Sequence, residues 1–187
     1  IRRVNTIHAN IRGTDLQGQP YVANEPELIR WEHLVEVASF LAAYQHLAKQ
    51  PLSPQACDQY IAEMSQVGHL LGAVNLPLTY AATQAELLGF ADALSFDARA
   101  EEILQLIQAY PVDVLDKPWM ALILKCAFDV MPLWVLGLMG QAPACAVQKQ
   151  ATRLAVQLSA EPVQWMLNQQ GVSAIARQRV QGGGQHA

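Results

Sequence analysis

The chain has 187 residues, of which 52% are hydrophobic and 15% are charged, and its formal net charge is −4. This composition excludes an intrinsically disordered chain, and the acidic balance excludes a basic surface for nucleic acid, so we expect no nucleic-acid partner. Cys57, Cys126 and Cys145 share no CxxC spacing, which argues against a disulfide framework or zinc ribbon and favours a reducing compartment, the cytoplasm.

Hydrophobic periodicity predicts helices along the whole chain, and no run of β-branched residues alternates with period 2. Glycines and prolines separate the helices, and four N-caps are expected, at Asn24, Ser53, Thr83 (with Glu86 in capping-box spacing) and Asp97. The expected helices cover residues 1–12, 25–49, 54–72, a short stretch opening at 83, 98–110, 118–130, 133–139, 143–159 and 162–170.

These segments predict one globular all-α domain of about eight helices, residues 1–181, followed by a flexible tail, 182–187. Residues 12–20 are expected to be a turn, and residues 21–23 are too short for more than an extended link. The first helix starts at full amphipathic strength at Ile1, without an N-cap or initiator Met. We therefore expect the domain to be N-terminally incomplete.

The segment Trp119 to Met139 is long and apolar enough to raise the question of a membrane span. It carries Lys125 and Asp129 in its middle, at a spacing that would let them pair on one helix face, and Pro132 follows them. Charges at mid-membrane are costly. We therefore favour a pair of helices in a water-soluble fold, with membrane contact as the less favoured alternative.

The first candidate site residue is His8. With Ile1, Val4 and Ile11 it forms an apolar stripe on the first expected helix, and Arg12 lies one turn further on, so both polar side chains would share one face. Such a histidine is most often a hydrogen-bonded core residue. Alternatively, it would be an axial metal or haem ligand, with the guanidinium of Arg12 anchoring a carboxylate.

His33 is the second candidate, with Glu36 one turn later. A histidine and a carboxylate on one helix face could bind a metal in a helical bundle, but carboxylate bundles use Glu-x-x-His pairs on two helices. This chain has one reversed copy, so we expect His33 to face a cavity or a backbone carbonyl and Trp31 to pack. No CxxCH motif occurs, which excludes covalently attached haem but not haem b.

Several blocks of the sequence, in the same order, resemble one known family. The first spans residues 7–46, with the pattern His8-x3-Arg12-Gly13, a glycine turn, Tyr21-x-Ala23 and Trp31-x-His33. Residues 51–72 and 76–83 continue it, and "DVMPLWVLGLMG" (129–140) resembles a later block. The pattern is similar to that of the latex-clearing-protein (rubber oxygenase) and MpaB-type oxygenase family, over most of residues 1–140.

The resemblance implies an all-α fold that holds haem b between helices, and an oxidoreductase that uses dioxygen on a hydrophobic, possibly isoprenoid, small molecule or polymer. The family's axial histidine corresponds to His8, so His8 would bind the metal and Arg12 would support the cofactor and the reaction. His33, which matches the Trp-x-His histidine, is the second expected catalytic residue. The chain begins after the position of the family's Arg-Leu-x-x-Thr motif, and it has Val135-Leu136 where the family has an arginine after Trp134.

Three functions remain open from the sequence. The first is the haem b-dependent oxygenase. The second is a non-catalytic all-α domain of the same fold that binds a lipid or a protein partner. The third is a non-haem metal protein that uses His8, His33 and Glu36.

Overall fold

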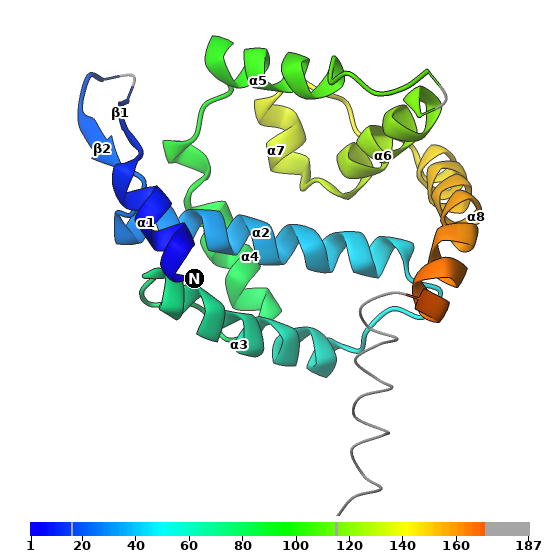
Figure 1. Cartoon of the computed structure of the whole chain (residues 1–187), viewed down its shortest axis with the longest axis horizontal. Helices are drawn as coiled ribbons and strands as arrows, with labels where there is room; N and C mark the ends of the chain where they lie inside the picture. Colours follow the sequence, from blue (N-terminus) through cyan, green and yellow to red (C-terminus); the bar gives the residue numbers. More distant parts are fainter. Residues whose placement is uncertain (16, 115, 171–187) are drawn as a thin grey trace, which may run out of the picture. The chain divides into compact units, whose positions relative to one another are not determined.

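A computed structural model describes residues 1–15, 17–114 and 116–170, and the side chains of residues 162–170 are not described. The expected tail, residues 182–187, lies outside the described residues. The described chain contains eight α-helices, one 3-10 helix and one two-stranded antiparallel sheet (Figure 1). The predicted all-α fold class is thus confirmed, with a small hairpin added.

The elements in chain order are α1 (Arg2–Asn10), β1 (Arg12–Thr14), β2 (Pro20–Val22), α2 (Pro26–Leu47), α3 (Pro54–Leu71), α4 (Tyr80–Gly89), η1 (Ala91–Ala93), α5 (Ala98–Gln108), α6 (Lys117–Val130), α7 (Leu133–Leu138) and α8 (Ala146–Gln170). They form two compact units. Unit 1 contains residues 1–107 and 130–143, and unit 2 contains residues 108–129 and 144–187. The domain limits 1–181 stay a prediction.

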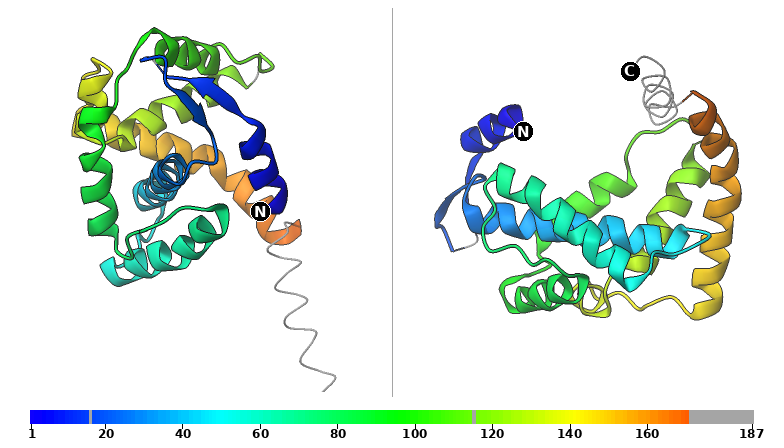
Figure 2. Two further views of the ribbon diagram at one scale, coloured as in Figure 1. Left: turned by 90° about the vertical axis from the view of Figure 1, so that its left-hand side faces the viewer. Right: turned by 90° about the horizontal axis from the view of Figure 1, so that it is seen from below.

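The core of unit 1 is built around α2, which packs beside α3 and α4 (Figures 1 and 2). The buried residues of α2 fall at positions 29, 33/34, 37/38 and 41, about one helical turn apart, so they line one side of the helix. Each fully buried aliphatic side chain contributes about 1.5–3 kcal/mol of transfer free energy. One cluster joins Ile29, Leu34, Ala38, Ala73, Leu76 and Leu87, and a second joins Val37, Leu41, Cys57 and Ile61.

Local capping signals explain where α3 begins and ends. The hydroxyl of Ser53 accepts a hydrogen bond from the backbone N–H of Ala56 at 3.2 Å, which satisfies one free donor of the first turn. The helix stops at Gly72, whose φ of 111° lies in the left-handed region that glycine adopts without strain. Both ends agree with the sequence prediction.

Two of the predicted N-caps are wrong. The helix α2 is preceded by Glu25, not Asn24, because Pro26 occupies its first position. The helix α4 begins one turn earlier than expected, since Thr79 caps it by accepting a hydrogen bond from the N–H of Ala82 at 3.2 Å. Thr83 instead lies inside the helix, fully buried, and its hydroxyl donates to the carbonyl oxygen of Thr79 at 2.9 Å.

The expected break at Pro162 is also absent, since α8 runs from Ala146 to Gln170 as one helix. A proline removes only one N–H donor from a helix, and the helix can continue past it. In contrast, the segment Trp119 to Met139 divides into α6 and α7 around Pro132. Among the described residues, no helix combines the length and apolar character that crossing a membrane requires.

Lys125 and Asp129, the expected pair of α6, have different environments. Lys125 is exposed, whereas Asp129 is buried at 6% relative exposure. The backbone carbonyl of Asp129 accepts a hydrogen bond from the ammonium group of Lys149 on α8, at 2.6 Å. This hydrogen bond from Lys149 therefore joins α8 to α6 within unit 2.

Candidate functional site

The hairpin brings together residues of the first sequence block that lie eight and ten positions apart. In the register of β1 and β2, Gly13 faces Tyr21 and Arg12 faces Val22. A Cβ atom at Gly13 would lie 2.6 Å from the hydroxyl oxygen of Tyr21 and 2.7 Å from its ring. Any larger residue would require the Tyr21 ring to move, so the Gly13 and Tyr21 positions of the block form one packing contact.

Sequence reasoning missed this hairpin and expected only a turn and an extended link. The turn is stabilised by the carboxylate of Asp15, which accepts hydrogen bonds from the backbone N–H groups of Gln17 and Gln19. Gly18 has a φ of 78°. An Asp and a Gly between two short extended stretches were the available signal for a hairpin.

His8 lies in the last turn of α1 and is half-buried. Its Nδ1 atom is enclosed and has no hydrogen-bond partner among the described residues. The predicted core-facing stripe is wrong for this helix: α1 buries none of its residues, and Ile1, Val4 and Ile11 are 52%, 39% and 48% exposed. The described part of the chain supplies no helix to cover that stripe, so the apolar residues around His8 remain accessible.

Asn5 shares a face of α1 with His8, because the two residues are three positions apart. Its side-chain amide donates a hydrogen bond to the carbonyl oxygen of Leu70 at 3.3 Å, which ties α1 to the end of α3. The other side-chain atom, Oδ1, is enclosed without a partner among the described residues. Sequence reasoning did not select Asn5, although a polar residue one turn before the histidine was a usable signal.

Arg12 does not share a helix face with His8, contrary to the prediction. The helix ends at Asn10, and Ile11 takes an extended conformation with φ −86° and ψ 116°. Arg12 is the first residue of β1 and is exposed. Strand pairing overrides the helical periodicity here, because the backbone of Arg12 is held in the ladder opposite Val22. The guanidinium is a solvent-facing cation at the edge of the hairpin.

His33 is buried at 4% exposure, between α2 and α3. A Cβ atom at Gly68 of α3 would lie 2.8 Å from Cδ2 and 2.9 Å from Nε2 of the imidazole. Burial lowers the pKa of His33 from 6.5, Glu36 opposes this effect and His69 adds to it. The ring is therefore neutral at pH 7, the form in which one nitrogen can accept a proton or a metal.

The structure adds His69 of α3 to the residues that act on His33, because its charge lowers the pKa of that ring. His69 is exposed, and its Nδ1 donates a hydrogen bond to the carbonyl oxygen of Ala73 at 3.0 Å, beyond the end of α3. Burial raises the pKa of Tyr60 on α3, and the exposed Glu36 adds to this effect. Nevertheless, no group of three or more His, Cys, Asp and Glu side chains among the described residues could hold a metal ion.

Trp31, beside His33 on α2, packs as expected against the core of unit 1. Its ring centroid lies 5.1 Å from that of Phe90 at an interplanar angle of 56°. Arg30 forms an ion pair with Glu86 of α4, and its guanidinium carbon lies 5.9 Å from the ring centroid of Phe90. This network joins α2 to α4 and holds the helix that carries His33.

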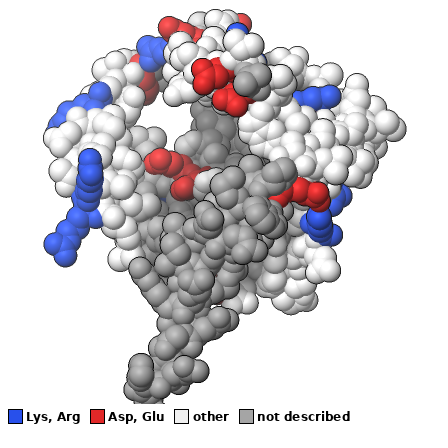
Figure 3. Space-filling view, turned by 45° about the vertical axis from the view of Figure 1, so that its right-hand side comes forward, with Lys and Arg blue, Asp and Glu red and all other residues white. Residues whose placement is uncertain are grey.

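Charged side chains are scattered over the face drawn in Figure 3, where Lys and Arg are separated by acidic and uncharged residues.

The sequence model of one protein family, described as "ER-bound oxygenase mpaB/B'/Rubber oxygenase, catalytic domain", matches residues 1–175 of the chain. No curated protein and no solved structure shows significant similarity to this chain.

Proposed function

Because the chain belongs to the family of mpaB and rubber oxygenase catalytic domains, we propose that it is a haem b-dependent oxygenase in which His8 would bind the iron. The family is one of oxygenases, so dioxygen is the co-substrate. Haem, when bound, supplies the activation of dioxygen. The substrate we propose is a hydrophobic, isoprenoid small molecule or polymer.

The environment of His8 is the observation that supports this proposal most directly. Its Nδ1 atom is enclosed and has no hydrogen-bond partner among the described residues, so the iron would bind the other ring nitrogen, Nε2. The exposed apolar side chains of the same helix and its N-cap, Ile1, Val4 and Ile7, are of the kind that a porphyrin face contacts. These residues fit haem bound through one protein ligand.

Arg12 and His33 would have supporting roles. The exposed guanidinium of Arg12 can form a charge-assisted hydrogen bond with a carboxylate, such as a haem propionate. His33 is neutral and buried, so it can exchange a proton only with a group that reaches the interface of α2 and α3. In this proposal Arg12 holds the cofactor, and His33 is a candidate proton carrier.

Other observations bear on the remaining alternatives and on location. A non-haem metal held by His8, His33 and Glu36 does not fit, because the described residues include no group of three such ligands that could hold an ion. Cys57, Cys126 and Cys145 are free thiols, which supports a reducing compartment, and we propose the cytoplasm. Failure of the protein to bind haem would favour the non-catalytic alternative.

The test is haem binding to the purified full-length protein. The wild type, reconstituted with haemin, is expected to show a Soret band, and His8→Ala is expected to lose it while its circular dichroism spectrum is unchanged. His186→Ala is the matched control, since it removes a histidine outside the sequence blocks and should keep the band. A wild type without the band would contradict the proposal and favour the non-catalytic domain; an equal band in His8→Ala would refute the role of His8.

A further inference from the structure

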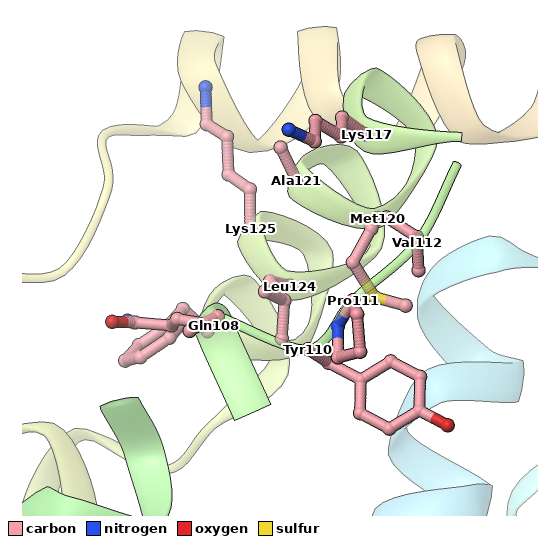
Figure 4. A pocket seen from close by; sticks show the side chains of 11 residues that line it. Gln108, Tyr110, Pro111, Val112, Lys117, Met120, Ala121, Leu124 and Lys125 are labelled. Carbon is pink, nitrogen blue, oxygen red and sulfur yellow. The ribbon is translucent and has the colours of Figure 1, made fainter. Parts of the chain in front are cut away.

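Unit 2 contains a pocket of about 770 Å³ that plays no part in the proposed haem site. It lies between one side of α6 and residues 108–112, which form the end of α5 and the chain that follows it (Figure 4). Ligand pockets for small molecules and cofactors usually measure roughly 300–1,000 Å³, so this pocket has the size of a binding site.

Two stripes of α6 side chains line the pocket. Met120, Leu124 and Phe128 lie at positions i, i+4 and i+8, which places them on one helix face as an apolar row. Lys117, Ala121 and Lys125 are also four positions apart, so they form a second row beside the first. The helix period therefore sets an apolar wall next to two cations.

The charges of the pocket are all of one sign. Among its eleven lining residues Lys117 and Lys125 are the only charged ones, and there is no Asp or Glu. In Figure 4 the two ammonium groups lie on one side of the pocket, whereas Tyr110 and Met120 lie on the other. A ligand that satisfies both sides must have an anionic end and an apolar body.

We propose that this pocket binds a fatty acid, with its carboxylate at Lys117 and Lys125 and its alkyl chain along Met120, Leu124 and Phe128. Charge selects the carboxylate, since both ammonium groups attract it, whereas an alcohol is uncharged and an ammonium ion is repelled. The row of thioether, aliphatic and aromatic side chains buries the methylene groups, each worth about 0.8 kcal/mol when fully buried. The inference is independent of the haem and of the residues in unit 1.

The experiment measures displacement of a dansyl-labelled fatty acid from the full chain by three competitors with the same alkyl chain: laurate, dodecanol and dodecylammonium. Laurate is expected to displace the probe at the lowest concentration. Its affinity should fall as salt is added, because the exposed lysines are screened. Equal or better displacement by dodecanol or dodecylammonium would overturn the proposal, as would failure of the probe to bind.

Two variants separate the contributions of charge and apolar surface. Lys117→Gln/Lys125→Gln keeps most of the side-chain length and is expected to weaken laurate binding about threefold to tenfold, while dodecanol binding is unchanged. Lys49→Gln, which removes a lysine from unit 1, should bind laurate like the wild type. Leu124→Glu should weaken the binding of both laurate and dodecanol. An unchanged laurate affinity in the double variant, with its circular dichroism spectrum intact, would refute the assigned carboxylate site.

Discussion

The contact between Gly68 and His33 makes a quantitative prediction for Gly68→Ala. The new Cβ atom would lie 2.5 Å from Cδ1 of Leu76 and 2.8 Å and 2.9 Å from two atoms of the His33 ring. Carbon atoms in favourable contact are roughly 3.5–4.0 Å apart, so the neighbours must move by about 1 Å. Leu76 can rotate, but both neighbours are buried, with exposures of 9% for Leu76 and 4% for His33.

The magnitude follows from two opposing effects. Overpacking a well-packed core costs about 1–3 kcal/mol. Replacing a glycine inside a helix by alanine stabilises the helix by roughly 0.5–1 kcal/mol, since the unfolded chain loses conformational freedom. Gly68 lies within α3, so Gly68→Ala gains this helix stabilisation. The net expectation is a loss of about 1 kcal/mol in the free energy of unfolding, within a range of roughly 0–2.5 kcal/mol.

Urea unfolding followed by circular dichroism measures this loss. With a slope of about 1–3 kcal/mol per molar urea, the midpoint of Gly68→Ala should fall by roughly 0.5 M. Gly89→Ala is the matched control, because Gly89 ends α4 and a Cβ atom there would have no neighbour within 4 Å. Its midpoint should stay or rise. A Gly68→Ala protein as stable as Gly89→Ala would refute the argument that the imidazole occupies this space.

Two further predictions concern the same unit. The pKa of His33 is lowered from 6.5 by burial, so the unfolded chain takes up a proton at higher pH than the folded chain does. The contribution of the neutral His33 ring to the free energy of unfolding is therefore complete above about pH 6.5, and it is lost as the pH falls below that value. The urea midpoint should therefore fall more steeply from about pH 7.5 to about pH 5 in the wild type than in His33→Gln, and parallel curves would contradict a buried neutral ring. Ser53→Ala should lose about 0.5–2 kcal/mol, since it removes the acceptor for the N–H of Ala56. Ser53→Asp retains an acceptor and should unfold near the wild-type midpoint, and an equal loss in both variants would speak against the cap.

The pairing of β1 with β2 was harder to predict from the sequence than the helices were. The hairpin depends on the contact of Gly13 with Tyr21 across a turn, and neither strand exceeds three residues. Strands this short have no periodicity to detect, whereas their pairing ends α1 and turns Arg12 away from the face of His8. The predicted His8–Arg12 face was wrong for this reason.

The sequence by itself determined the helical class and the ends of α3, because caps, glycine stops and helical periodicity act over four residues or fewer. It also determined the family, through sequence blocks that need no structure to be recognised. Only the tertiary structure decided which apolar stripes are covered. It buries His33 against Gly68, and it leaves the stripe of α1 exposed around the Nδ1 atom of His8, which has no hydrogen-bond partner among the described residues. Both stripes look alike in the sequence; they differ in whether another helix packs on them, which depends on residues far away along the chain.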